Sequence, residues 1–302
     1  MNKICMVAAI GTPMTLDEQL HSEGLVAQLD RLGEANVSGI LVAGTFGVMQ
    51  MLRDDTYCDL VTQACGYGRF GGKLFIGVSD MSSIRTKQRI HFVNQFCIDG
   101  VVVLPPFFMA FSQQEILDYY RSLADESKAP VYLYDLPQRT HVAINPQTVL
   151  ALAQHPNIAG IKCSGPVAQA LNLIEQVTEL GLDFEVLLAH PDRLVELAEN
   201  GVRSHLDGIY ALAPHWAMQV ARGVTMGRSV HEVQNDLTQL RDVLRRHGGL
   251  SALTPLMNAC GIPGRFSPAP FQTLSVQQQR DLFNEPVVKK LLATESLAVS
   301  AV

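Results

Sequence analysis

The sequence predicts an α/β fold: a parallel (β/α)8 barrel of the TIM type with a C-terminal helical extension. Eight short apolar, β-branched runs recur at nearly regular intervals, and amphipathic helical stretches lie between them. Almost every run is continuously apolar rather than alternating, which is typical of strands buried on both faces. Eight strand–helix units in succession favour a closed barrel over the competing open, doubly wound sheet.

The apolar runs define the predicted strands. They cover residues 4–10, 38–43, 73–78, 100–104, 130–135, 157–163, 183–189 and 206–212. The first run follows a lysine, as the apolar part of a signal peptide does, but it is short and Thr12-Pro13 interrupts it. We therefore interpret it as a strand. No apolar segment approaches the length that spans a membrane, and we expect no membrane association.

Helical periodicity predicts helices over 16–32, 112–127, 144–154 and 166–180, with Ser112 as a cap and Pro146 near a helix start. Beyond residue 225 the pattern predicts three further helices, which reach to about Lys290. We expect residues 293–302 to be frayed or loosely docked. The expected organisation is a barrel over 1–225 with helices of 226–302 packed on it, as a single structural unit.

Composition excludes several classes of function. The net charge is -6 and no basic stripe is present, which argues against nucleic-acid binding. The six cysteines have no CxxC spacing and suit a reducing cytoplasm, and the nine histidines form no HxxxH set for a metal. The GxGxxG match at 66–71 follows a helix and precedes a strand, the reverse of a dinucleotide-binding turn. We expect no metal and no cofactor.

Lys162 is the lysine that stands at the carboxyl end of an apolar predicted strand, where barrel enzymes place their chemistry. Desolvation penalises the charged form of an amine, and a neutral amine attacks carbonyls to form a Schiff base. Tyr134, one predicted strand away, is suited to proton transfer, and the Thr45 hydroxyl to orienting that tyrosine. In the alternative interpretation, Lys162 extends to solvent and Tyr134 fills the barrel mouth.

Two segments carry a resemblance to a known family. YDLPQRT (134–140) resembles a Y-N-x-P-x-R-T pattern, and GIKCSG (160–165) a G-x-K-x-S pattern, both of the dihydrodipicolinate synthase / N-acetylneuraminate lyase superfamily. These are pyruvate-dependent class I aldolases, and the resemblance extends from Ile10 to about Pro270. It implies that Lys162 is the Schiff-base lysine, Tyr134 the proton-transfer tyrosine, and Thr45 the hydroxyl that links to Tyr134 and to the keto-acid carboxylate.

The GTFG segment (44–47) resembles the family's G-T-T-G but departs from it. Phe46 replaces a carboxylate-binding threonine, which leaves the backbone N–H groups of the Gly44–Gly47 loop to hold that carboxylate. Phe108 stands where the synthases have a tyrosine that completes a proton relay from a neighbouring subunit. Asp135 replaces an asparagine, and His190 stands where a glycine is usual.

Arg139 matches an arginine that meets the acceptor's carboxylate in the synthases, while pairing with a surface acid is the alternative. Tyr210, at the end of the eighth predicted strand, is a further candidate for substrate binding. The loops after the last two strands lack a glycine-rich phosphate turn, which favours unphosphorylated substrates.

The expected activity is a carbon–carbon lyase that joins or splits pyruvate, or a related 2-keto acid, and an aldehyde. The expected substrate is of the 2-keto-3-deoxy sugar acid type. Dihydrodipicolinate synthase proper, a keto-deoxy acid dehydratase and a non-catalytic keto-acid-binding protein remain open alternatives. The resemblance also implies a homo-oligomer, a tetramer or dimer, with Phe108 as a candidate interface residue.

Overall fold

The computed structural model describes residues 3–68 and 70–299, and its strands form a closed parallel barrel in the order of the sequence. The strands are β1 Cys5–Ala9, β2 Gly39–Val42, β3 Lys73–Gly77, β4 Gly100–Val103, β5 Val131–Asp135, β6 Ile158–Cys163, β7 Glu185–Leu188 and β8 Ser204–Asp207. The predicted barrel is confirmed, and the first seven strands lie within their predicted ranges.

The described chain divides into two compact units. One holds residues 73–190 and 204–206, and the other holds residues up to 72, 191–203 and from 207 onward. The helices of the first unit are α3 Ser83–Val93, α4 Gln113–Glu126, α5 Pro137–Thr140, α6 Pro146–Leu152 and α7 Val167–Glu179. The boundary predicted between residues 225 and 226 stays a prediction.

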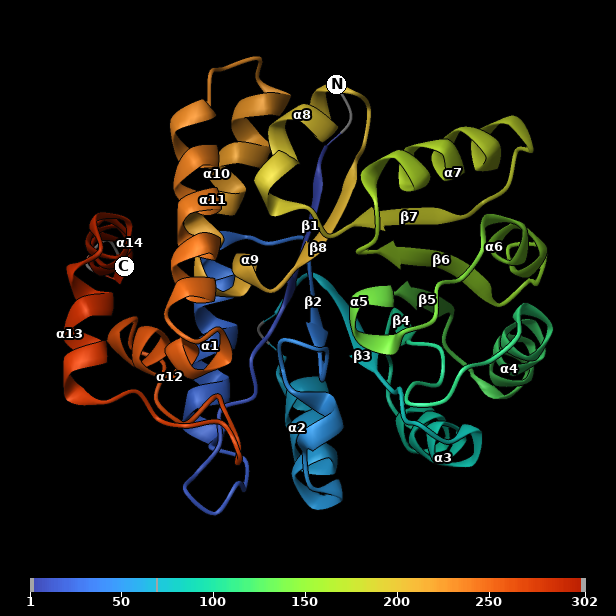
Figure 1. Cartoon of the computed structure of the whole chain (residues 1–302), viewed down its shortest axis with the longest axis horizontal. Helices are drawn as coiled ribbons and strands as arrows, with labels where there is room; N and C mark the ends of the chain where they lie inside the picture. Colours follow the sequence, from blue (N-terminus) through green and yellow to red (C-terminus); the bar gives the residue numbers. More distant parts are fainter. Residues whose placement is uncertain (1–2, 69, 300–302) are drawn as a thin grey trace. The chain divides into compact units, whose positions relative to one another are not determined.

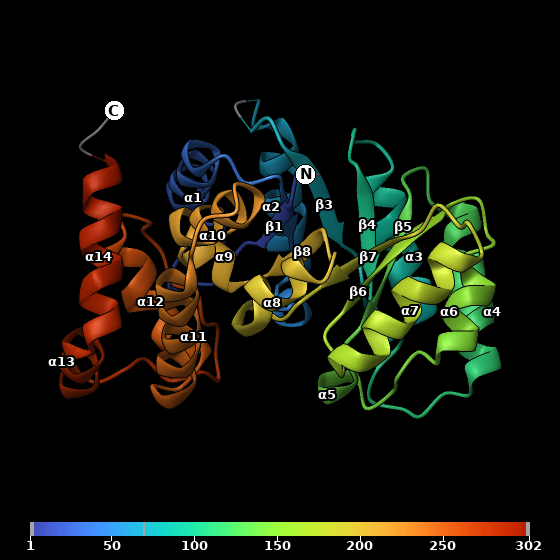
Figure 2. The same cartoon turned by 90° about the horizontal axis from the view of Figure 1, so that it is seen from above.

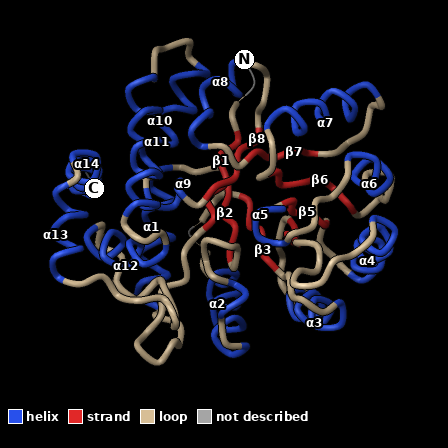
Figure 3. The backbone as a smooth tube through the Cα atoms, in the orientation of Figure 1, coloured by secondary structure: helices blue, strands red, loops and turns tan. Residues whose placement is uncertain are grey.

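In the first unit the strands pair in parallel from β3 to β7, and α3, α4, α6 and α7 lie side by side along one side of them (Figures 1 and 2). Figure 3 shows the same strands on the inner side of these helices. Helix α4 is capped by Ser112, as predicted, in a capping box: Ser112 Oγ accepts from Glu115 N–H and the Glu115 carboxylate accepts from Ser112 N–H.

The second unit contains β1 and β2 with most of the remaining helices. These are α1 Ser22–Ala35, α2 Asp54–Gly66, α8 Leu194–Glu199, α9 Ile209–Leu212, α10 Pro214–Thr225, α11 His231–Arg246, α12 Leu250–Ala259, α13 Val276–Asn284 and α14 Pro286–Val299, with 3-10 turns at Met49–Met51 and Pro191–Arg193. Strands β1 and β2 pair in parallel, with Ala8 opposite Ile40.

Three predictions about the C-terminal half are wrong. The eighth strand is Ser204–Asp207 rather than 206–212, because Gly208 breaks the run and Ile209 N–H bonds to Asp207 Oδ1 to start a helical turn. Beyond residue 225 the described chain forms four helices rather than three. Residues 293–299 belong to α14, and Glu295 is 4% exposed, so this part is docked rather than frayed; residues 300–302 lie outside the described residues.

Candidate active site

The pairing of β5 with β6 determines which side chains meet. Tyr132 is opposite Gly160 and Tyr134 is opposite Lys162. Because side chains alternate across a strand, Tyr132, Tyr134 and Lys162 share one face. Ile161, Cys163 and Asp135 project from the other face, where they line a small cavity of about 30 Å³ together with residues of α6 and α7.

Lys162 is 5% exposed, and its Nζ lies 4.0 Å from the centroid of the Tyr134 ring. Tyr134 is also 5% exposed. The lysine is therefore a buried amine over an aromatic face, and the alternative in which it extends to solvent does not describe this structure. An adjacent phenol is a group that can carry a proton.

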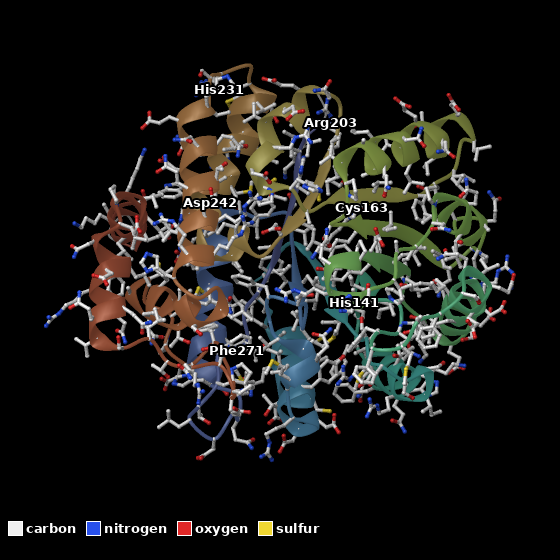
Figure 4. The ribbon with its side chains drawn as sticks, in the orientation of Figure 1. His141, Cys163, Arg203, His231, Asp242 and Phe271 are labelled. Carbon is white, nitrogen blue, oxygen red and sulfur yellow. The ribbon has the colours of Figure 1, made fainter. Side chains whose placement is uncertain are left out.

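Neighbouring groups on the outer face of β5 and β6 differ from this pair. Burial raises the pKa of the Cys163 thiol to about 12, so the thiol is protonated at neutral pH and is not a competing nucleophile. Burial also raises the pKa of Asp135, whose Oδ1 accepts a hydrogen bond from Ile144 N–H at 3.1 Å. Figure 4 labels Cys163 on β6, next in the chain to Lys162, and His141 at the end of α5.

Arg139 lies on α5, directly after β5, and its side chain is exposed. The turn that carries it is held internally, because Thr140 Oγ1 donates to Leu136 O or Val142 O, at 3.1 and 2.8 Å. No acid in the described part of the chain pairs with the Arg139 guanidinium, so the alternative of a surface ion pair finds no partner there. The guanidinium is available to a carboxylate from solution.

In the other unit, the predicted carboxylate-binding loop follows β2 as a compact turn. Gly44 and Gly47 are buried, whereas Thr45 and Phe46 are half-buried. Gly47 O accepts from Thr12 Oγ1 at 2.7 Å, and a Cβ at Gly47 would lie only 2.9 Å from Ile10 O. Glycine is therefore required for the close approach of this loop to the chain after β1.

The Phe46 ring packs against the turn that follows β8, since a Cβ added at Gly208 would lie 2.3 Å from Phe46 Cδ2. Tyr210 lies in that region, within α9 rather than at a strand end, and its side chain is fully buried. Its hydroxyl has no hydrogen-bond partner among the described residues. Burial raises the pKa of Tyr210 well above its ordinary value. Its contact with substrate stays a prediction that this buried placement does not favour.

Two side chains near Lys162 have contacts that the sequence does not predict. His190 is half-buried, and its Nε2 lies 2.9 Å from Gly165 O. Gln138 Nε2 donates to Ser164 O at 2.9 Å. A side chain that bonds to a backbone carbonyl leaves no spacing pattern in a sequence. The one feature of the sequence that points to these contacts is the histidine at position 190, where the resembling family has glycine.

Within residues 3–68 and 70–299, no three His, Cys, Asp or Glu side chains are grouped as metal ligands. The described helices include none that is both long and apolar enough to cross a bilayer. What these residues offer chemically is an amine over a phenol ring and, on α5, an exposed guanidinium.

The strands define a (β/α)8-barrel protein, and a lysine amine is a group that can form a Schiff base with a carbonyl compound. The sequence profile of the dihydrodipicolinate synthetase family matches residues 3–287, so this chain belongs to that family, whose members are carbon–carbon lyases of the class I aldolase type. Membership confirms the resemblance and the expected class of enzyme.

Individual proteins agree with this assignment. The chain is 26% identical to the 4-hydroxy-tetrahydrodipicolinate synthase of Ligilactobacillus salivarius over 292 residues, which cover 93% of this chain and 97% of that protein. The dihydrodipicolinate synthase structure from Bacteroides thetaiotaomicron has a TM-score of 0.88 at 21% identity, over 96% of this chain and all (100%) of that one. A 2-keto-3-deoxygluconate aldolase variant of Sulfolobus solfataricus has a TM-score of 0.84 at 18% identity, covering 96% of both chains. At these identities the two structures show the shared fold alone.

Proposed function

We propose that this protein reversibly joins pyruvate, or a related 2-keto acid, to an aldehyde through a Schiff base on Lys162, with an unphosphorylated 2-keto-3-deoxy sugar acid as the product or substrate. The position of Lys162 Nζ, buried and 4.0 Å from the Tyr134 ring centroid, is the observation that carries the proposal.

The reaction begins when the neutral Lys162 amine adds to the keto carbon. The hydroxyl group of this adduct takes up a proton and leaves as water, which gives the iminium ion. The iminium ion withdraws electrons and lets the adjacent carbon lose a proton to form an enamine. The enamine carbon then bonds to the aldehyde carbon, whose oxygen takes up a proton. In the cleavage direction Tyr134 removes the proton of that hydroxyl, the carbon–carbon bond breaks, and the iminium takes up the electron pair.

The remaining predicted site residues have binding roles in this proposal. The resemblance assigns Thr45 and the N–H groups of Gly44 and Gly47 to the keto-acid carboxylate, and we keep that assignment as part of the proposal. Phe46 supplies an apolar wall. Arg139 binds an acid group on the second substrate, because a guanidinium matches a carboxylate in two parallel hydrogen bonds. Tyr210 keeps only a supporting place in this proposal because it is buried.

The second candidate is dihydrodipicolinate synthase proper, which the names of the curated relatives favour. Phe46 and Phe108 argue against it, since each stands where the resembling synthases carry a hydroxyl group. A keto-deoxy acid dehydratase shares the opening steps. We further propose a cytoplasmic homo-oligomer, a dimer or tetramer; the six free cysteines suit a reducing compartment.

Two experiments test the assignment. Borohydride treatment with pyruvate is expected to add mass at Lys162, and no adduct at saturating pyruvate favours the alternative of a non-catalytic keto-acid-binding protein. A panel of aldehydes with pyruvate, read by product mass, then separates the two enzyme candidates. Condensation only with aspartate semialdehyde indicates the synthase, whereas condensation with polyhydroxy aldehydes indicates the sugar-acid lyase.

A further inference from the structure

The turn after β6, Ser164–Pro166, is hydrogen-bonded on both sides: to Asp135 and Gln138, at the end of β5 and on α5, and to His190, after β7. We propose that His190, which stands after β7, is a positioning residue for the Lys162 amine: its ring holds the backbone of this turn and thereby holds the end of β6. The proposal rests on the Schiff-base role of Lys162. It adds His190 as a supporting residue, and a protein with glycine at this position has no side chain that could do the same.

The hydrogen bond from His190 continues the pairing of β6 with β7. The β6–β7 ladder matches Cys163 with Leu188, and Ala189 N–H bonds to Cys163 O at 2.9 Å. The next residue, His190, turns its ring to Gly165 O, at 2.9 Å from Nε2. A carbonyl oxygen only accepts, so Nε2 carries the proton and donates. The half-buried ring thus extends the ladder beyond its last backbone bond.

The other side of the turn is bonded to the last residue of β5 and to helix α5. Ser164 N–H bonds to Asp135 O at 3.0 Å, and Gln138 Nε2 donates to Ser164 O at 2.9 Å. The carbonyl groups of the two residues that follow Cys163 therefore each accept a hydrogen bond from a side chain beyond a neighbouring strand, Gln138 on α5 and His190 after β7. Ser164 and Gly165 are held at fixed positions although they lie beyond the end of β6.

Holding this turn matters because Lys162 must present its amine to a carbonyl carbon from a defined direction. A misplacement of about 1 Å is enough to slow a positioned reaction by about 100-fold. Lys162 reaches its place over the Tyr134 ring from a backbone only two residues before Ser164. Glycine at position 190 has no side-chain donor, so this fastening is a property of the present chain.

The test measures how fast the imine forms. Full-length wild-type protein and His190→Ala are mixed with pyruvate, quenched with borohydride at successive times, and the mass increase on Lys162 is followed. Loss of one neutral hydrogen bond corresponds to a slowing of about 3–10-fold. We expect this slowing in the trapping rate and in kcat, with little change in KM for pyruvate. His190→Gln, whose amide also donates, is expected to recover part of the rate.

His155→Ala is the matched control. His155 is also a half-buried histidine of the same unit, and its Nδ1 accepts from Asn157 N–H at 3.2 Å just before β6 begins. It therefore supports the opposite end of the strand that carries Lys162, and its removal is expected to leave the trapping rate unchanged. Gln138→Ala changes an exposed side chain, so it folds, and it is expected to slow trapping in the same direction as His190→Ala.

Equal trapping rates in wild type, His190→Ala and Gln138→Ala overturn the positioning role and leave the Schiff-base assignment intact. Equal slowing in His190→Ala and His155→Ala also overturns it, since the effect then reflects general support of the strand. No adduct in the wild type overturns the proposed function itself, and the positioning role with it.

Discussion

At the scale of single residues, the proposed activity depends on two side chains that strand pairing places on one face. Tyr134→Phe keeps the aromatic ring beneath Lys162 and removes only the hydroxyl. We expect turnover to fall by about 100-fold or more, the usual contribution of a proton-transfer group. Initial rates of aldol formation or cleavage measure it.

Tyr119→Phe is the control, because Tyr119 is a buried tyrosine of the same unit whose hydroxyl donates to Thr86 Oγ1 at 3.2 Å. It is expected to leave turnover unchanged. Turnover that stays at the wild-type level in Tyr134→Phe removes the proton-transfer role from Tyr134.

Asp135 offers a test by pH. Burial raises its pKa above the ordinary 3.8, so the folded state favours the protonated carboxyl group. Below the pKa that Asp135 has in the unfolded chain, its full contribution to the stability of the folded state is present. This contribution is lost as the pH rises through the higher pKa of Asp135 in the folded protein. Asp135→Asn avoids the cost of a buried charge and retains an acceptor for Ile144 N–H.

We therefore expect Asp135→Asn to melt at a higher temperature than wild type at pH 7, and the difference to disappear at about pH 3. Thermal melts across this range measure it. Asp125→Asn, at an aspartate whose side chain is 72% exposed, is the control with little expected change. A lower melting temperature for Asp135→Asn at pH 7 would contradict the expectation.

At the scale of elements, a large ring fits between β4 and β6 only because glycines face it. Cβ atoms added at Gly100 and Gly160 would lie 2.8 and 2.7 Å from the Tyr132 ring, and the one at Gly160 would also lie 2.4 Å from Glu185 O. Because backbone cannot yield as a flexible side chain does, Gly160→Ala is expected to lower the free energy of unfolding by about 1–3 kcal/mol.

Urea unfolding measures this change. Gly33→Ala is the matched control: Gly33 lies within α1, nothing approaches its added Cβ within 4 Å, and alanine is the better helix former. It is expected to stabilise slightly. Unaltered stability in Gly160→Ala would show that the strands adjust around the ring.

A buried ion pair joins α14 to α1, and its arginine also donates hydrogen bonds to α9. Arg31 Nε lies 2.7 Å from Glu295 Oε2, and Arg31 Nη1 and Nη2 donate to Ala211 O and Leu212 O at 3.1 and 2.6 Å. Because both side chains are less than a tenth exposed, removing one charge leaves the other buried and unpaired. Glu295→Gln is expected to cost about 3–5 kcal/mol of stability.

Glu232→Gln provides the comparison. Glu232 lies on α11 and pairs with Lys290 of α14, but its side chain is 83% exposed. Little change is expected there, and chemical unfolding measures both variants. Equal stability of Glu295→Gln and wild type would contradict the fastening of α14 by this pair.

The sequence predicts what depends on local pattern. Apolar runs and the Ser112 cap predict β1 to β7 and the start of α4, and the two motifs around Tyr134 and Lys162 predict the family. Helix α9, Ile209–Leu212, consists of apolar residues that suit a strand equally well. It is distinguished as helical only by Gly208 and by the hydrogen bond from Ile209 N–H to Asp207 Oδ1. The contacts of His190, Gln138 and Glu295 depend on residues distant in the sequence, and no local period encodes them.

At the scale of the whole molecule, we expect self-association through an apolar surface of the unit that contains Lys162. The loop after β3 and the start of α3 expose Met81 and Ile84, at 48% and 64%, and the loop after β4 exposes Phe108 and Met109, at 81% and 62%. These two loops adjoin, since Met81, Pro106 and Phe111 line one hollow. Phe108 has a φ of +84°, a strained conformation for a bulky residue that is found mainly where function requires it.

Phe108→Glu places a charge on this apolar surface and relieves none of its backbone strain. We expect the mass in sedimentation velocity to fall to that of a smaller species at micromolar concentration, because burying an unpaired charge at an interface is costly. Leu180→Glu is the matched control, since Leu180 is exposed by 59% at the end of α7 in the same unit. A single species of unchanged mass in Phe108→Glu would exclude this surface as the interface. A wild-type protein that sediments as a monomer would exclude the homo-oligomer itself.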